Sequence, residues 1–222
     1  MKEIIAFLDQ LMRNNNREWF NAHKSEYQYH QSHFNDFALK LIDGIAEFDS
    51  DVYGLELKDC TYRIYRDIRF SPDKRPYKNH MGCYVCKGGK KSWKAGYYFH
   101  IEAHEGDYIG SNLLATGMYI VPRENLLAIR DVIANNGDEF ADALKKAGNF
   151  SFSESSYLKR VPNGFPKDSP YADYLRLKDY SLSMPLPDDI LFGSEDELLN
   201  FVLKQFKTSK DFNQLLNKIV EP

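Results

Sequence analysis

The chain has 222 residues, of which 43% are hydrophobic and 27% charged, and its formal net charge is −3. These values are typical of a globular protein with a sizeable core, and they exclude a chain that is disordered throughout. No run approaches the roughly 20 apolar residues of a membrane span, and three cysteines are an odd number for a secreted disulfide framework. We therefore expect a single cytoplasmic domain over residues 1–222 that has no membrane partner.

The first fifth of the chain has the periodicity of helices. Apolar residues recur at helical spacing over residues 3–14, and the asparagines at 14–16 supply a break and an N-cap for a following helix. From Trp19 onward the apolar stripe continues to Ile45, which predicts a long helix packed against another layer.

The middle of the chain has the residue pattern of strands. We expect a short strand over residues 62–67 and longer ones over residues 81–86, 97–103 and 108–115. Turn residues lie between the longer strands, at 88–89 and at 105–107, so the strands should form an antiparallel meander.

The last hundred residues return to helices. Pro122 suits the first turn of a helix that runs to Ile133, and Asn136 and Gly137 should separate it from a shorter helix. The proline-rich stretch 150–187 is expected to be mostly loop, with a short helix near 171–177. A capping box at Ser194 begins the first of two final helices. The predicted fold is α+β, with a central antiparallel sheet flanked by the N-terminal and C-terminal helices.

The positive charge of the chain is concentrated in one segment. Residues 63–94 contain ten Lys or Arg and two acids, a net charge of +8, whereas the remainder carries −11. We expect this segment to form the most positive surface of the fold and to attract an anionic ligand. The alternative is that its cations pair with the acidic remainder.

The densest part of this segment is the run 63–78. In a strand, Arg63, Tyr65 and Asp67 would share one face, and residues 71–76 form a turn whose cations could close over a ligand. Guanidinium groups match the paired oxygens of phosphate or carboxylate. A second basic loop near residue 160 could converge on the same place. The candidate ligand-binding residues are Arg63, Arg66, Arg69, Lys74, Arg75, Tyr77, Lys78, Lys159 and Arg160. The alternative is a lattice of Arg and Asp that pins the loop to the sheet.

Several sequence runs resemble one protein family. They are the run 63–78, Trp19-Phe20, the strand opening Gly96-Tyr97-Tyr98, and residues 158–165. Together they resemble domain of unknown function 2461, which occurs in bacteria and fungi, and the resemblance covers almost the whole chain. It implies a single domain, but it implies no activity, substrate, cofactor or catalytic residue.

Two patterns suggest metal ligands. His100, Glu102 and His104 would share one face of a strand and could hold a divalent ion, although a solvated polar face is the favoured interpretation. Cys83 and Cys86 lie three apart, so in a strand their thiols should point to opposite faces and bind no ion together. We predict no metal site, and no motif in the sequence identifies a cofactor.

These observations leave three functions open. The first is a module that binds a phosphorylated or polyanionic ligand, including nucleic acid, with Tyr65, Tyr77 or Trp93 stacking on bases. The second is a hydrolase or transferase acting on a phosphorylated substrate, with Asp67 or His100 as the catalytic base. The third is a structural protein that has no ligand.

Overall fold

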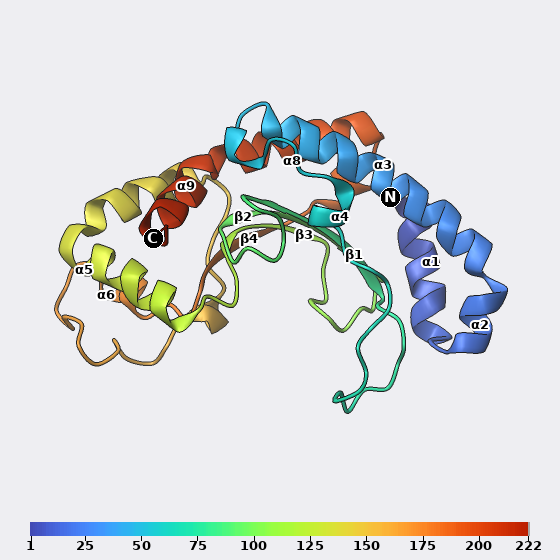
Figure 1. The fold of residues 1–222 in the computed structure, drawn as a ribbon, viewed down its shortest axis with the longest axis horizontal. Coiled ribbons are helices and arrows are strands. Elements are labelled where there is room, and N and C mark those ends of the chain that lie inside the picture. Colours follow the sequence, from blue (N-terminus) through green and yellow to red (C-terminus); the bar gives the residue numbers. More distant parts are fainter. Residues whose placement is uncertain (222) are drawn as a thin grey trace.

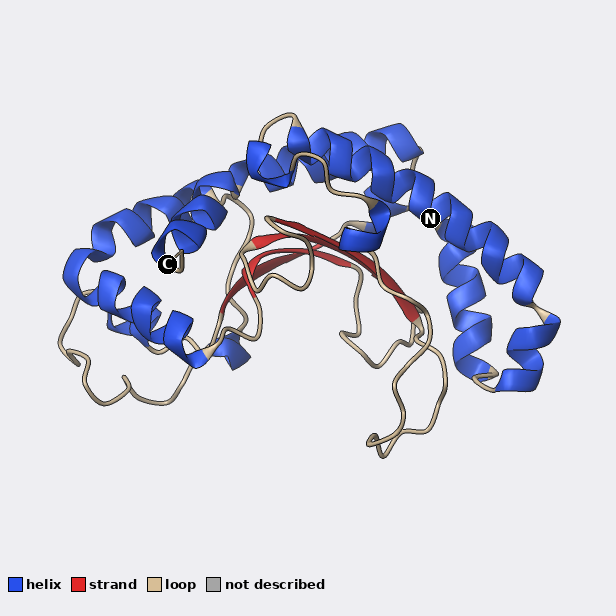
Figure 2. Ribbon diagram, viewed as in Figure 1, coloured by secondary structure: helices blue, strands red, loops and turns tan. Residues whose placement is uncertain are grey.

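A computed structural model describes residues 1–221 and contains one four-stranded antiparallel sheet with helices on one side (Figures 1 and 2). The strands are β1 (His80–Cys86), β2 (Gly96–Glu102), β3 (Leu113–Met118) and β4 (Tyr180–Pro185), and they lie in the order β1-β2-β3-β4. The predicted α+β fold with an antiparallel meander is confirmed, but the short strand expected over residues 62–67 is absent, because that segment makes only an isolated bridge between Tyr65 and Tyr77. The prediction of a strand over 108–115 began too early, and β4 lies in the stretch that was expected to be mostly loop.

The N-terminal helices agree with the sequence pattern. They are α1 (Lys2–Arg13), α2 (Arg17–Ala22), α3 (Lys24–Ala46) and the short α4 (Leu57–Cys60), with the 3-10 turn η1 (Ser50–Val52) before α4. The side chain of Asn16 accepts a hydrogen bond from the backbone N–H of Trp19, so it is the expected N-cap. One feature differs, because the chain breaks at His23 and the single long helix expected from Trp19 is two helices.

The C-terminal helices form the other flank. They are α5 (Arg123–Lys146), α6 (Ala172–Leu175), α7 (Asp188–Leu191), α8 (Glu195–Thr208) and α9 (Lys210–Ile219), with the 3-10 turn η2 (Glu154–Ser156) before α6. The break expected near Asn136 is a kink within α5, where that residue has non-helical backbone angles. The capping box of Ser194 and Glu197 begins α8, as predicted.

The two faces of the sheet have different surroundings. Helices α3 and α8 arch over its convex face, while the opposite, concave face looks toward the space between the two helical flanks (Figure 1). Phe99 packs on Phe37 of α3 with ring centroids 4.9 Å apart, and Tyr97 packs on Phe206 of α8 at 5.4 Å. The alternation of β2 therefore buries Tyr97, Phe99 and Ile101 in the core and turns the even-numbered residues to the concave face. Within residues 1–221, no helix is both long enough and apolar enough to cross a bilayer.

Two amides of α9 attach that helix to the sheet. Asn213 accepts a hydrogen bond from the N–H of Gly117 (2.9 Å) and donates one to the carbonyl of Gly96 (3.2 Å). One turn later, Asn217 makes the same pair of bonds with the N–H and carbonyl of Ala95 (2.7 and 3.1 Å). Because these backbone groups are buried, the amides supply partners that water cannot.

We predict that Asn213→Ala lowers the free energy of unfolding by about 2 to 4 kcal/mol, because it leaves buried backbone groups of Gly96 and Gly117 without a partner. Urea denaturation followed by circular dichroism measures this change. The control is Gln214→Ala on the exposed side of the same helix, which should change the stability by less than about 0.5 kcal/mol. Equal stabilities for the two variants would contradict the role given to the amide.

Candidate functional site

The concave face of the sheet forms the floor of a cleft of about 1040 Å³, which is large enough for a small organic ligand. The walls come from the segment 62–80, from residues 107–109 and from residues 119–120. The floor includes Tyr84, Tyr98, Ala115, Gly117 and Ser183, one or more from each strand. Asn15, Lys90, Trp93 and Lys94 also line the cleft, which therefore depends on the sheet and on several segments far apart in the sequence.

One wall is a hairpin, here called the arm, formed by residues 62–78. The N–H of Arg66 donates to the carbonyl of Pro76 (2.9 Å), and the N–H of Lys78 donates to that of Ile64 (2.8 Å). The arm is attached to the N-terminal helices by Tyr77, whose ring stacks on Phe20 with centroids 3.9 Å apart. Tyr77 is buried, so among the candidate ligand-binding residues it serves as the anchor of the arm.

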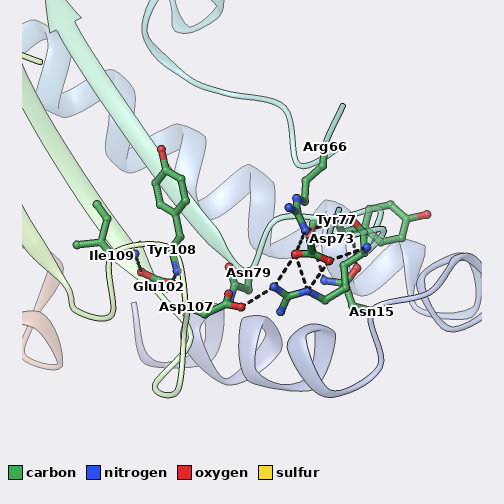
Figure 3. A network of polar contacts seen from close by, with 10 residues as sticks. Asn15, Arg66, Asp73, Tyr77, Asn79, Glu102, Asp107, Tyr108 and Ile109 are labelled. Carbon is green, nitrogen blue, oxygen red and sulfur yellow. Dashed lines mark hydrogen bonds and ion pairs between the residues drawn. The ribbon is translucent and has the colours of Figure 1, made fainter. Parts of the chain in front are cut away.

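An ionic network joins the arm to the turn after β2 (Figure 3). Asp73 lies 2.5 Å from a guanidinium nitrogen of Arg66 and 2.7 Å from one of Arg75. Arg75 also reaches Asp107 at 2.5 Å, and Asn79 donates to the same carboxylate at 3.1 Å. The hydrogen bonds from Arg75, with those from Arg66, hold the pKa of Asp73 well below its usual range. For Arg66 and Arg75 the structure therefore has the Arg and Asp lattice that the sequence left open.

Three further candidates lie toward the tip of the arm. Arg69 binds both carboxylate oxygens of Asp67 (2.9 and 2.7 Å), and these hydrogen bonds lower the pKa of Asp67 to about 2. A carboxylate with so low a pKa is a weak base at neutral pH. Lys74 donates to the carbonyl of Ile68 (3.1 Å). Asp67 lines the cleft, whereas neither Arg69 nor Lys74 does.

Two cations of the cleft wall, unlike the arginines above, have no carboxylate or carbonyl partner among the described residues. Neither Arg63 nor Lys78 makes a side-chain hydrogen bond or ion pair with any other residue in the described range 1–221. Lys78 is partly buried, and its pKa is lowered by burial and by the charge of Arg63. Its ammonium lies 5.3 Å from the ring centroid of Tyr62, and that of Lys90 lies 5.8 Å from the same ring. The wall therefore presents two cations that form no side-chain hydrogen bond or ion pair within the described chain, although the charge of Arg63 contributes to the low pKa of Asp67.

A buried polar chain lies beneath the cleft floor. Glu102 is 1% exposed and accepts hydrogen bonds from the backbone N–H groups of Tyr108, Ile109 and Gly110 (2.7, 3.0 and 3.0 Å). Figure 3 shows Glu102 beside Tyr108 and Ile109. Its other partner is His100, at 3.1 Å. Burial opposes ionisation of Glu102, but the hydrogen bonds from His100 and the backbone outweigh it and lower the pKa to about 2.

This burial contradicts the favoured interpretation of His100, Glu102 and His104 as a solvated strand face. Residues 105–110 fold back over the end of β2 and cover its polar side chains, which strand alternation alone does not reveal. His104 lies beyond the end of β2 and binds Asp9 of α1 at 2.7 Å. In the part of the chain that the structure describes, no three His, Cys, Asp or Glu side chains are grouped to hold a metal ion.

Exposed apolar side chains gather around the cleft, although such groups are elsewhere usually buried. Those that line it are Tyr62, Tyr65, Trp93, Tyr108, Ile109, Tyr119 and Ile120. Trp93 and Ile120 have φ angles of 59° and 54°, a left-handed conformation that is uncommon for any bulky residue. Such strain concentrates at functional sites, and here it accompanies two side chains that face the cleft.

The remaining candidates lie apart from the cleft. Arg160 lines a separate hollow of about 520 Å³ in the proline-rich loop, and Lys159 precedes it in the chain. The two basic loops therefore do not line the same cavity. Cys83 and Cys86 are on opposite faces of β1, as their spacing predicted, because Cys83 packs in the core while Cys86 bonds the carbonyl of Gly89 (3.1 Å).

The comparisons with known proteins identify the family. A family model described as "Conserved hypothetical protein (DUF2461)" matches residues 3–215, so the chain belongs to this family, as the sequence runs suggested. Searches of curated proteins and of solved structures found no match.

The depressed pKa of Glu102 predicts a dependence of stability on pH. Its ionised form favours the folded state, so this contribution is present above about pH 4.5 and is lost as the pH falls toward 2. We expect the free energy of unfolding to fall by up to about 3 kcal/mol more in the unmodified protein than in Glu102→Gln across this window. Urea denaturation at a series of pH values measures the two slopes.

The control for this experiment is Glu105→Gln, which changes an exposed carboxylate three residues away. It should keep the slope of the unmodified protein. Parallel slopes for Glu102→Gln and the unmodified protein would show that Glu102 does not contribute in this way.

Proposed function

Since membership of DUF2461 assigns no activity, we propose from the site that the cleft binds a phosphate-bearing, polyanionic ligand. The proposal rests on one observation. Arg63 and Lys78 line the cleft wall, and neither forms an ion pair with a residue of the described chain. The other arginines of the arm position this pair, because their own charges are matched by Asp67, Asp73 and Asp107.

The surroundings of the Lys78 ammonium favour an anionic ligand. Partial burial of an ammonium without a counter-charge is unfavourable, and its pKa is correspondingly lowered. A phosphate in the cleft would supply the missing charge and accept hydrogen bonds from Lys78 and from the planar fork of Arg63. The same ligand would reach Lys90, which shares the Tyr62 ring with Lys78.

The aromatic lining favours a ligand that has planar groups as well as phosphates. Trp93, Tyr108 and Tyr119 expose their rings in the same cleft, and a bare inorganic ion would use none of them. Single-stranded nucleic acid combines a negative backbone with bases that stack on such rings. We therefore favour a single-stranded oligonucleotide as the ligand class.

The first test concerns the two unpaired cations. Arg63→Lys and Lys78→Met should each weaken binding of a fluorescein-labelled oligothymidylate about tenfold or more, because each loses charge-assisted hydrogen bonds to phosphate. In Lys78→Met, the slope of log affinity against log salt should also fall by about 0.7. Fluorescence anisotropy measures both quantities.

The matched control is Arg69→Lys, on the same arm but paired with Asp67 and outside the cleft lining. Its affinity should stay within about twofold of the unmodified protein. If Arg63→Lys instead lowers the melting temperature and leaves the affinity unchanged, Arg63 belongs to the scaffold and the proposed site is wrong.

The second test concerns Trp93. We expect Trp93→Ala to weaken oligothymidylate binding about fivefold or more, since base and aromatic stacking contributes about 1–3 kcal/mol per base. Tyr53→Ala, at an 85% exposed ring outside the cleft, is the control and should bind as the unmodified protein does. The protein has two tryptophans, so quenching of its fluorescence on binding should also disappear in Trp93→Ala.

A further inference from the structure

Three hydrogen-bonded side chains on alternate residues of β2 run from the floor of the cleft into the buried region beneath it. The hydroxyl of Tyr98 lies 2.9 Å from Nδ1 of His100, and Nε2 of His100 lies 3.1 Å from a carboxylate oxygen of Glu102. Alternation places all three on the concave face, and Tyr98 is the member that lines the cleft. The hydrogen bonds therefore run from a buried carboxylate through an imidazole to the hydroxyl of a residue that lines the cleft.

The position of each proton follows from the chemistry of the groups. Glu102 has a pKa of about 2 and is ionised at neutral pH, so it only accepts hydrogen bonds. Nε2 of His100 must then carry the hydrogen that binds Glu102. In the neutral imidazole Nδ1 is an acceptor, and it receives the hydroxyl hydrogen of Tyr98. His100 is thus arranged as a base for the phenol.

The need to hold the turn after β2 in place does not explain why Tyr98, His100 and Glu102 are all hydrogen-bonded together. Glu102 alone receives the three N–H groups of residues 108–110, and that function needs neither His100 nor Tyr98. The neighbouring strand also makes room for the hydroxyl, because a Cβ at Gly82 would lie 2.5 Å from the oxygen of Tyr98. A hydroxyl, a base and a group that orients the base are the parts of a nucleophilic triad.

We propose that Tyr98 is a catalytic nucleophile toward a phosphate ester bound in the cleft, with His100 as its base and Glu102 as the residue that positions His100. This inference rests on the proposed function, because Arg63 and Lys78 would hold the phosphate. The cleft is then an active site as well as a binding site.

Each step of the reaction balances. The oxygen of Tyr98 forms a bond to phosphorus while its proton passes to Nδ1 of His100, and the bond from phosphorus to the leaving oxygen breaks. Because attacking and leaving oxygens are in line at phosphorus, the leaving oxygen departs on the side away from His100 and takes its proton from water, which becomes hydroxide. The imidazolium, stabilised by Glu102, meanwhile keeps the proton of Tyr98. Hydroxide then attacks the tyrosyl phosphate opposite Tyr98, the bond from phosphorus to the oxygen of Tyr98 breaks, and the imidazolium of His100 gives its proton to that departing oxygen. The net change is hydrolysis of one phosphate ester bond.

The surroundings of Tyr98 make the base necessary. Burial, with the nearby phenols of Tyr62 and Tyr108, raises the pKa of Tyr98 well above its ordinary value, so a phenolate does not form unaided at neutral pH. The titratable groups that face His100 are Tyr98 and Glu102 on β2, His80 on β1 at 5.2 Å between ring centroids, and Tyr108 at 6.0 Å. His80 stays neutral, because burial lowers its pKa to about 3.

Tyr84 provides a matched control in the same cleft. It pairs directly with Tyr98 in the register of β1 and β2, and it also lines the cleft. Its hydroxyl donates to the backbone carbonyls of Lys94 (2.7 Å) and Gly117 (3.1 Å), which cannot take its proton. A reaction that requires only a phenol in this cleft would occur at both tyrosines, whereas the proposed reaction occurs at Tyr98.

The experiment uses the full chain and bis(p-nitrophenyl) phosphate as the probe. We expect a burst of p-nitrophenolate approaching one equivalent per chain, and tandem mass spectrometry should locate a p-nitrophenyl phosphate group on Tyr98. Tyr98→Phe should abolish the burst, whereas Tyr84→Phe should retain it within about twofold. His100→Gln should slow the burst about a hundredfold or more, as loss of a general base does.

The pH profile separates catalysis from a structural role. In the unmodified protein the burst rate should fall toward acidic pH, because a general base must be unprotonated to accept the phenolic proton. Glu102→Gln should slow the burst at least about tenfold. Melting temperatures identify any variant that does not fold. If His100→Gln and Glu102→Gln both unfold, the comparison of Tyr98→Phe with Tyr84→Phe decides whether Tyr98 is the nucleophile.

The outcomes distinguish this inference from the proposed function. No adduct in the unmodified protein, an adduct on Tyr84, or a burst that survives Tyr98→Phe would overturn the assignment of Tyr98. Oligothymidylate anisotropy on the same preparations tests the binding site separately. Binding without an adduct rejects the triad alone, and absence of both rejects the site.

Discussion

The buried carboxylate of Glu102 connects most of the parts that make the cleft. Three backbone N–H groups of residues 108–110 converge on it, which holds the turn after β2 against the sheet. The same turn carries Asp107, which binds Arg75 of the arm at 2.5 Å. A charge that is ionised, buried and fully hydrogen-bonded is costly to disturb, because each lost partner leaves a desolvated group behind. The position of the arm over the sheet therefore depends on a residue outside the arm.

The distribution of partners separates scaffold from site within one basic segment. Arg66, Arg69 and Arg75 each have a carboxylate within 2.7 Å, and such pairs hold the arm in one conformation. Arg63 and Lys78 have no carboxylate at ion-pair distance among the described residues, and both line the cleft. A single count of charge could not make this distinction, since all five side chains contribute equally to a net charge of +8.

Strand and helix periodicity predicted most of the fold. The amphipathic stripes of α1, α3, α8 and α9 and the alternation of β1 and β2 are local patterns, and each was found where it was predicted. β4 was missed because it lies between prolines, and its short alternating run, Tyr180–Pro185, is stabilised by pairing with β3. The start of β3 was misplaced because residues 108–110 have the side chains of a strand but donate their N–H groups to Glu102.

Sequence alone was enough to predict the class of the fold, the opposite orientations of Cys83 and Cys86, and the basic segment as the place to seek a site. These follow from period, spacing and composition, which are properties of neighbouring residues. The family was indicated separately, by the resemblance of several sequence runs. The pairing of the cations, the anchoring role of Tyr77 and the burial of His100 and Glu102 beneath the cleft floor became evident only from the folded chain. The reason is that Asp107, Asn15 and Phe20 meet the arm across distances along the chain that no local pattern encodes.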